Sequence, residues 1–178
     1  MQVHNTSSGA REAVEGDTYW MRYAMVLAAK AEALQEVPVG AVIVRDGEIL
    51  GEGWNQPISS CDPTAHAEIQ ALRQAATAAA NYRLLGASIY VTLEPCTMCI
   101  GALVHARIER LVFGAYESKA GAVVSKAQLL DGDYLNHRVS HEGGVLATEC
   151  QHQLSSFFQR RREQKRQERL AVKTESRE

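Results

Sequence analysis

A helix is predicted between residues 18 and 34, because apolar side chains recur there every three or four positions and fall on one face. These residues are Trp20, Ala24, Leu27, Ala31 and Leu34. Asp17 or Thr18 can cap the N-terminus of this helix with a side-chain oxygen. We expect the apolar stripe to be buried.

Two β-rich segments follow, Gly40–Val44 and Glu48–Trp54, joined by Arg45-Asp46-Gly47. An Asp-Gly pair between such segments is a strong signal for a hairpin turn, so the pattern predicts two antiparallel strands. Two further apolar segments, Ala87–Leu93 and Arg110–Ala115, are predicted to be strands.

Asp62-Pro63 predicts another helix, because Asp is a good N-cap and Pro suits the first helical position. This helix is expected to run through Ala76, with His66 and Glu68 in its first turn.

Pro95 should open a second short helix that runs through Val104. A last helix is expected from Ala147 to about Leu170, with an apolar face made of Cys150, Leu154, Phe157 and Phe158. No large apolar residue follows Phe158 until Leu170, so the end of this helix should leave the body of the protein.

These elements predict an α/β protein in which a mixed sheet carries helices on both faces. The 178 residues, 46% of them hydrophobic, suit one compact domain, which we place at residues 17–170. Residues 1–16 and 171–178 are polar and lack an apolar period, so we expect a disordered N-terminal extension and a disordered tail.

The net charge of −2 is unevenly distributed along the chain. Residues 157–178 hold eight Lys or Arg against four Glu, a local charge of +4, so residues 1–156 carry −6. A basic segment on an acidic body suggests a polyanionic partner, although a solvated helix face rich in Arg and Glu has the same composition. Neither a secretory signal nor a membrane span is evident, which predicts a cytoplasmic protein. In a reducing compartment Cys61 and Cys150 should be free thiols.

His66-x-Glu68 and Pro95-Cys96-x-x-Cys99 are the segments that carry candidate chemistry. One imidazole and two thiolates leave a tetrahedral Zn²⁺ one position short, and a water in that position becomes acidic, as in hydrolytic zinc sites. Glu68 would lie beside that water with its charge uncommitted, which suits a general acid and base. Cys96 and Cys99 share one helix face at a helix N-terminus, where the free N–H groups favour thiolates.

Two other interpretations of these residues remain. A lone Cys-x-x-Cys near alternating strands and helices is also typical of a thioredoxin-like redox pair. A structural zinc site would need a fourth protein ligand, for which His105 is the available candidate.

The chain resembles the bacterial tRNA-specific adenosine deaminases, which convert the wobble adenosine of a tRNA anticodon to inosine. The resemblance covers residues 19–169 and rests on seven segments: Pro38-Val39-Gly40-Ala41-Val42, Gly51-Glu52-Gly53-Trp54-Asn55, Asp62-Pro63-Thr64-Ala65-His66-Ala67-Glu68, Asn81-Tyr82-Arg83-Leu84, Leu93-Glu94-Pro95-Cys96-Thr97-Met98-Cys99, Asn136-His137-Arg138 and Phe157-Phe158. It implies a cytidine-deaminase-like three-layer α/β/α fold with a mixed five-stranded sheet, one Zn²⁺ per subunit and a homodimer that binds the tRNA anticodon stem-loop.

The same resemblance implies His66, Cys96 and Cys99 as zinc ligands and Glu68 as the proton shuttle. It implies that Asn55 holds the purine, and we expect further substrate contacts from Ala67, Phe158 and Arg161. From the residues alone, Asn55 could also be a turn residue in Trp54-Asn55-Gln56-Pro57.

Of the aromatic pair Phe157 and Phe158, at least one should be core; we expect Phe158 to be exposed beside Arg160, Arg161 and Arg162, where it could stack a base. The chain departs from the family pattern at Tyr116-Glu117-Ser118, which leaves the RNA contacts of that loop open. Two other functions share these features: deamination of a free base or nucleoside, and zinc-stabilised RNA binding without chemistry.

Overall fold

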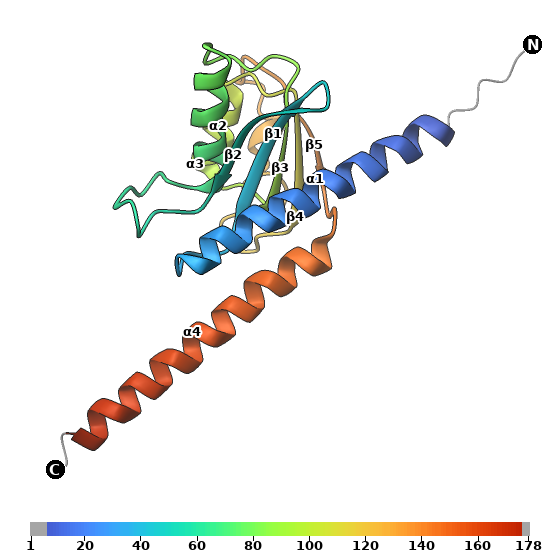
Figure 1. Cartoon of the computed structure of the whole chain (residues 1–178). Coiled ribbons are helices and arrows are strands. Elements are labelled where there is room, and N and C mark those ends of the chain that lie inside the picture. Colours follow the sequence, from blue (N-terminus) through green and yellow to red (C-terminus); the bar gives the residue numbers. More distant parts are fainter. Residues whose placement is uncertain (1–6, 176–178) are drawn as a thin grey trace, which may run out of the picture.

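A five-stranded mixed sheet forms the centre of the computed structural model, which describes the backbone of residues 7–175 and the side chains of residues 16–172 (Figure 1). The strands are β1 (Gly40–Arg45), β2 (Glu48–Trp54), β3 (Ser88–Leu93), β4 (Arg110–Ala115) and β5 (Ser140–Gly143). Their order is β2-β1-β3-β4-β5. The β1–β2 and β1–β3 pairs are antiparallel, and β3–β4 and β4–β5 are parallel. The predicted mixed sheet is confirmed.

The predicted hairpin is confirmed with its turn. Arg45 pairs with Glu48, and the two residues between them both adopt positive φ, 54° at Asp46 and 78° at Gly47. A two-residue hairpin turn needs this left-handed backbone at both central positions, and Asp-Gly is among the sequences that adopt it at least cost.

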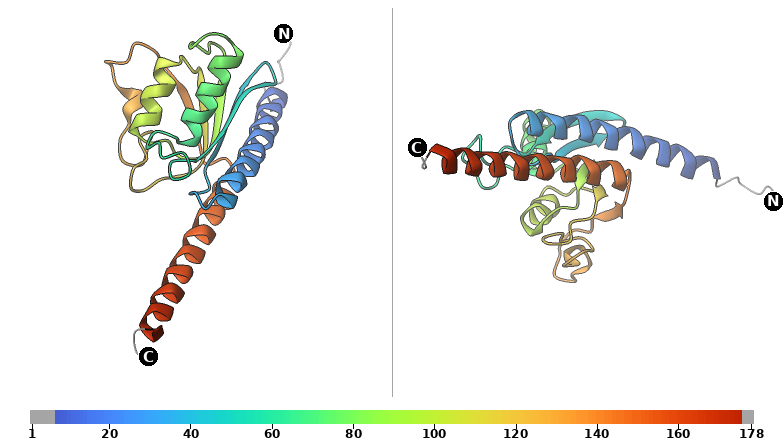
Figure 2. Two further views of the ribbon diagram at one scale, coloured as in Figure 1. Left: turned by 60° about the vertical axis from the view of Figure 1, so that its left-hand side comes forward. Right: turned by 90° about the horizontal axis from the view of Figure 1, so that it is seen from below.

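Helices cover both faces of the sheet, as the three-layer prediction requires. Contacts place α1 (Ser7–Ala33) and α4 (Ala147–Glu175) on one face, and α2 (Ala67–Ala78) on the other face beside α3 (Thr97–His105) (Figure 2). Close approach depends on glycine, because a Cβ at Gly40 would collide with the α1 backbone. A Cβ at Gly53 would likewise collide with the α2 backbone at Ala67.

The outer helices are longer than the sequence pattern predicted. Helix α1 begins at Ser7, so the predicted disorder is wrong for residues 7–16, where Ala10, Arg11, Glu12 and Ala13 are good helix formers that extend a well-packed helix. Helix α4 continues to Glu175, beyond the predicted end near Leu170. The predicted disorder of residues 1–6 and 176–178 lies outside the described residues.

Helix α2 begins at Ala67 and not at Pro63, so His66 is its N-cap residue and Glu68 lies in its first turn. Asp62 does not cap this helix, because its Oδ1 accepts the backbone N–H of Thr64 at 2.8 Å and closes a local turn. The start of α2 is capped from elsewhere in the chain: Asn55 Oδ1 accepts the backbone N–H of Ala67 at 2.9 Å.

The predicted apolar faces are largely correct. In α1 the stripe is buried at Ala24, Leu27 and Ala31, but Leu34 lies past the end of the helix and is 52% exposed. In α4 the side chains of Cys150, Leu154 and Phe157 are buried and Phe158 is exposed. Beyond Phe158 the helix leaves the body of the protein, as predicted (Figure 1).

Strand β5 was not located in the sequence, because its four residues Ser-His-Glu-Gly are polar and mostly exposed. Its position is set by parallel pairing with β4, where Arg110 lies opposite Ser140. Within the described residues, no helix is long and apolar enough to cross a membrane.

Three strand ends meet at one edge of the sheet. Strands β2 and β3 are both antiparallel to β1, and β4 is parallel to β3, so all three run in the same direction. Trp54, Leu93 and Ala115, their last residues, therefore end at the same edge, where ligands of such sheets commonly bind.

Candidate active site

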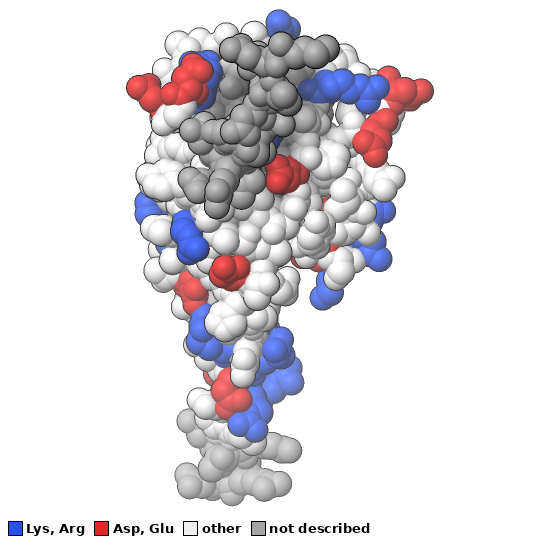
Figure 3. All heavy atoms as spheres, turned by 90° about the vertical axis from the view of Figure 1, so that its right-hand side faces the viewer, with Lys and Arg blue, Asp and Glu red and all other residues white. Residues whose placement is uncertain are grey.

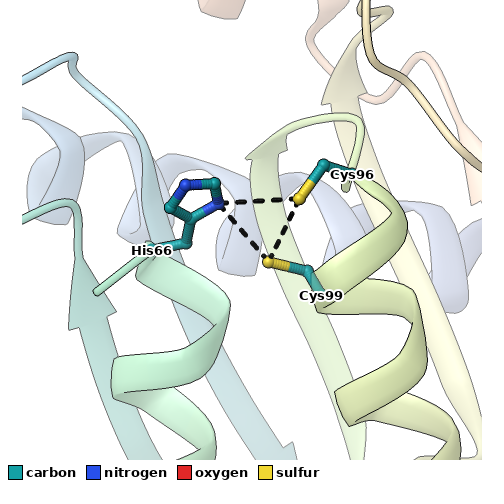
Figure 4. Close-up of side chains that lie close together, drawn as sticks. All are labelled: His66, Cys96 and Cys99. Atoms are coloured by element: carbon teal, nitrogen blue, oxygen red, sulfur yellow. Dashed lines mark hydrogen bonds between the residues drawn. The ribbon is translucent and has the colours of Figure 1, made fainter. Parts of the chain in front are cut away.

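The three predicted zinc ligands meet at this edge, at the N-termini of two adjacent helices (Figure 4). His66 is the N-cap residue of α2, reached by the loop that follows β2. Cys96 is the N-cap residue of α3, which follows β3, and Cys99 lies in the first turn of that helix. Residues far apart in sequence come together because β3 lies in the sheet next to β1.

The donor atoms have the spacing that a tetrahedral zinc ion requires. His66 Nδ1 lies 3.7 Å from Cys96 Sγ and 3.6 Å from Cys99 Sγ, and the two sulfurs are 3.8 Å apart. Zinc bonds of about 2.3 Å to sulfur and about 2.0 Å to nitrogen, at tetrahedral angles, predict separations of about 3.8 Å and about 3.5 Å. The triangle of donors therefore fits one Zn²⁺.

The two sulfurs differ in their electrostatics. The hydrogen bond between Cys96 and Cys99 lowers the pKa of Cys96 to about 3, with further lowering from His66 and against the effect of burial. The same contact with Cys96, together with burial and the nearby Glu68 carboxylate, raises the pKa of Cys99. The lowered pKa favours the thiolate form of Cys96, which suits a metal ligand.

Glu68 lies beside the donors without joining them. Its side chain is 4% exposed, and burial raises its pKa. Among the described residues, the group of donor atoms close enough to share an ion holds His66, Cys96 and Cys99 alone. A carboxylate next to the centre but outside the ligand set can exchange protons with a molecule bound there.

The geometry favours the three-donor centre over both alternative interpretations of the motif. A redox pair does not account for His66, whose Nδ1 completes the triangle with both sulfurs. His105 is exposed at the far end of α3 and is not part of the donor group, so it supplies no fourth ligand. Cys96 and Cys99 are both free, as are Cys61 and Cys150, so the predicted free thiols are confirmed.

Asn55 and Ala67 lie next to the three metal donors and are joined by a hydrogen bond that fixes the local backbone. The Asn55 side chain is buried, and its amide oxygen holds the N–H of Ala67, which fixes the start of α2 directly after His66. Its amide nitrogen has no hydrogen-bond partner among the described residues. Asn55 therefore holds a helix start through one end of its amide, and the other end is free for a ligand.

Phe158 and Arg161 line one cavity of about 270 Å³ at the junction of three segments. Val37 comes from the α1–β1 connection, and Ile58 from the loop that leads to His66. The cavity thus has apolar walls and a cationic rim on α4, next to the loop that carries a zinc ligand.

Two buried carboxylates near the site, Glu36 and Glu94, were given no role from the sequence. Glu36, which is 1% exposed, accepts the N–H of Ser59 at 2.7 Å and holds the loop that precedes His66. Glu94 is 2% exposed and directly precedes Pro95-Cys96. Glu94 could have been recognised as a candidate site residue, because it is a carboxylate that directly follows a buried strand.

A mixed sheet of this topology, with a three-donor centre between two helix starts, defines a zinc-dependent deaminase. The family model for the cytidine and deoxycytidylate deaminase zinc-binding region matches residues 14–115, which include all three donors and Glu68. Among characterised relatives, the tRNA-specific adenosine deaminase of Haemophilus influenzae is 56% identical over 90% of this chain and 93% of its own. That of Streptococcus pyogenes serotype M1 is 41% identical over 92% and 95%.

The chain belongs to the tRNA-specific adenosine deaminase family. A solved structure from work on A-to-I editing by tRNA:A34 deaminases matches with a TM-score of 0.75 and 42% identity, covering 77% of this chain and 99% of the other. A guanine deaminase of Nitrosomonas europaea matches with a TM-score of 0.66 but only 20% identity over 79% and 83% of the two chains, which shows a shared fold alone.

Proposed function

We propose that this protein hydrolyses the wobble adenosine of a tRNA anticodon loop to inosine and releases ammonia. The observation that carries the proposal is the donor triangle with the buried Glu68 beside it, on a chain 56% identical to a tRNA-specific adenosine deaminase. A zinc ion held by the three donors would acidify a water in its fourth position and so supply the nucleophile for attack on C6 of adenine.

Glu68 moves the protons in this reaction. Its carboxylate takes a proton from the attacking water and delivers it to the adenine ring nitrogen. It then takes the proton of the new hydroxyl on C6 and delivers it to the amino group, which leaves as ammonia. Burial keeps the carboxylate away from competing water, and positioned proton transfer of this kind contributes about 10²- to 10⁴-fold to a rate. The side chain of Asn55 is held by the N–H of Ala67, and its amide nitrogen would donate a hydrogen bond to the purine.

The exposed part of α4 is the proposed RNA-binding element. Lys and Arg side chains gather on the helix where it projects from the body (Figure 3). These residues are Arg160, Arg161, Arg162, Lys165, Arg166 and Arg169. Phosphate contacts from such a row would hold the anticodon stem, and Phe158 at the base of the helix would stack a loop base.

We also propose a homodimer with one zinc ion per subunit in the cytoplasm. Four free cysteines, one of them exposed, support a reducing compartment. Family membership supports the dimer, which light scattering of the purified protein would test.

The decisive experiment offers the protein a choice of substrates. Unmodified tRNA transcripts, an anticodon stem-loop, free adenosine and free guanine would be incubated in parallel, with inosine mapped by sequencing and ammonia measured. Inosine at the wobble position alone is expected, because the basic residues of α4 can contact the phosphates of an RNA and have no such contact with a free base. Turnover of free bases without RNA editing would contradict the proposal. Binding of RNA without release of ammonia would indicate an RNA-binding protein that has no deaminase activity, and would also contradict it.

A further inference from the structure

Glu94 is a buried carboxylate whose hydrogen bonds all run to one loop, residues 116–126 after β4. Its Oε1 accepts three successive backbone N–H groups, those of Val123, Val124 and Ser125, at 3.1, 2.8 and 2.9 Å. Its Oε2 accepts the N–H of Glu117 at 3.0 Å and the hydroxyl of Ser125. The loop is therefore folded around this one side chain.

The loop is also fitted closely to the ligand-bearing turn. The N–H of Ala122 donates to the carbonyl of Pro95 at 2.9 Å, directly before Cys96. Gly121 lies so near that a Cβ there would collide with the Glu94 carboxylate. Residues 121–123 are buried by these contacts, and residues 118–120 remain exposed as the tip of the loop.

The position of the loop makes these contacts relevant to the reaction. It leaves β4 at the same edge of the sheet at which Asn55 follows β2 and Cys96 follows β3. Glu94 thus connects the segment that presents a zinc ligand to a neighbouring loop whose tip is open to solvent. Glu117 itself is turned back on the loop, since its Oε1 accepts the N–H of Lys119 at 2.8 Å.

We propose that Glu94 is a positioning residue that holds the 116–126 loop as a wall of the substrate entrance beside Cys96. This inference rests on the proposed function, because the substrate admitted there is an RNA loop. Without the carboxylate the loop loses the acceptor for four backbone N–H groups, and its tip no longer has one fixed place.

Glu94→Gln tests the proposal with almost no change of shape. Both carboxylate oxygens accept N–H groups, so the amide NH₂ faces a donor in either orientation and the loop must shift. We expect the KM for an anticodon stem-loop to rise about tenfold, with a smaller change in kcat and with zinc content unchanged. Gly121→Ala displaces the same loop from the other side and should raise the KM in the same way.

Asp17→Asn is the matched control. Asp17 is also a buried carboxylate with several partners, Arg110 at 2.6 and 2.8 Å and the Tyr90 hydroxyl at 2.9 Å. Arg110 begins β4, so this network lies at the opposite edge of the sheet. The control should lower the melting temperature and leave the KM unchanged.

Three results would overturn the proposal: a KM within about twofold of wild type in Glu94→Gln and Gly121→Ala, loss of zinc from either variant, or an equal rise in Asp17→Asn. If Glu94→Gln does not fold, Gly121→Ala and the milder Ser125→Ala decide the outcome. A wild-type protein that makes no inosine in RNA would instead contradict the proposed function.

Discussion

Glu68 lies close to the three donor residues, but its role in proton transfer can be distinguished from their role in zinc binding by substitution. Glu68→Gln should retain one zinc per subunit, because the carboxylate is outside the donor group. Inosine formation should fall by at least about 10²-fold, since the amide cannot carry a proton. Metal analysis and a single-turnover assay on an anticodon stem-loop would measure the two effects.

Glu109→Gln is a suitable control for that substitution, because Glu109 is an exposed carboxylate in the connection between α3 and β4, beyond the end of α3 that lies away from the donors. It should leave both zinc content and turnover unchanged. Near-normal turnover in Glu68→Gln would remove Glu68 from the mechanism.

Phe157 and Phe158 are neighbours with different environments, and they form a matched pair of probes. Phe157 is 4% exposed and Phe158 is 44% exposed, with ring centroids 5.5 Å apart. Phe157→Ala should lower the free energy of unfolding by about 3–5 kcal/mol, through loss of buried contacts and the cavity left behind. Chemical denaturation would measure this loss.

Phe158→Ala should change the free energy of unfolding by less than about 0.5 kcal/mol, as expected for an exposed site. Its RNA affinity should fall by about 1–3 kcal/mol if the ring stacks a base. Unchanged RNA affinity in a normally stable Phe158→Ala would show that the ring does not contact RNA.

At the scale of the element, α4 divides into a packed half and a projecting half. Leu154 and Phe157 are buried, and every described residue beyond Phe158 except Arg161 is exposed. Truncation after Gln159 should therefore preserve the fold while removing the basic row. We expect a melting temperature close to wild type, a KM for the anticodon stem-loop raised at least about tenfold, and a shallower dependence of RNA binding on salt.

Charge and helix length can be distinguished in the full chain. Replacing Arg162, Lys165 and Arg166 with Gln retains the helix and should reproduce most of the effect of truncation. Arg22→Gln, which removes an exposed charge outside α4, is the matched control and should change little. Normal editing by the truncated protein would show that RNA binds elsewhere.

Element boundaries show where local sequence signals end. The hairpin at Asp46-Gly47 could be predicted from its turn residues, because both Asp and Gly readily adopt the positive φ that the turn requires. The start of α2 could not be predicted in this way. Asp62 caps a local turn, and the N–H of Ala67 is instead held by Asn55 from another loop. A nonlocal cap overrode the local Asp-Pro signal.

At the scale of the whole molecule, zinc should be needed for activity and not for folding. The core runs through the sheet and all four helices, and the donors lie at one edge of it. Chelation should abolish inosine formation, lower the melting temperature and leave the far-ultraviolet circular dichroism spectrum nearly unchanged. Activity should return when zinc is restored. Loss of helical signal on chelation would instead indicate a structural metal.

The sequence by itself determined the chemistry of this protein and most of its local structure. One imidazole, two thiolates and an uncommitted carboxylate specify a hydrolytic zinc site by their identities, and the Cys-x-x-Cys spacing places both sulfurs at one helix start. The hairpin, strands β3 and β4 and the buried face of α4 were likewise set by turn residues and by the period of apolar positions.

Only the tertiary structure decided how these pieces meet. His66 reaches the cysteines because β2 and β3 run in the same direction on either side of β1, and Glu94 finds its partners in a loop that follows another strand. Strand β5 has no apolar pattern of its own and exists through pairing with β4. Such contacts are stabilised by residues distant in sequence, so they cannot be predicted from the local propensities of the segments that make them.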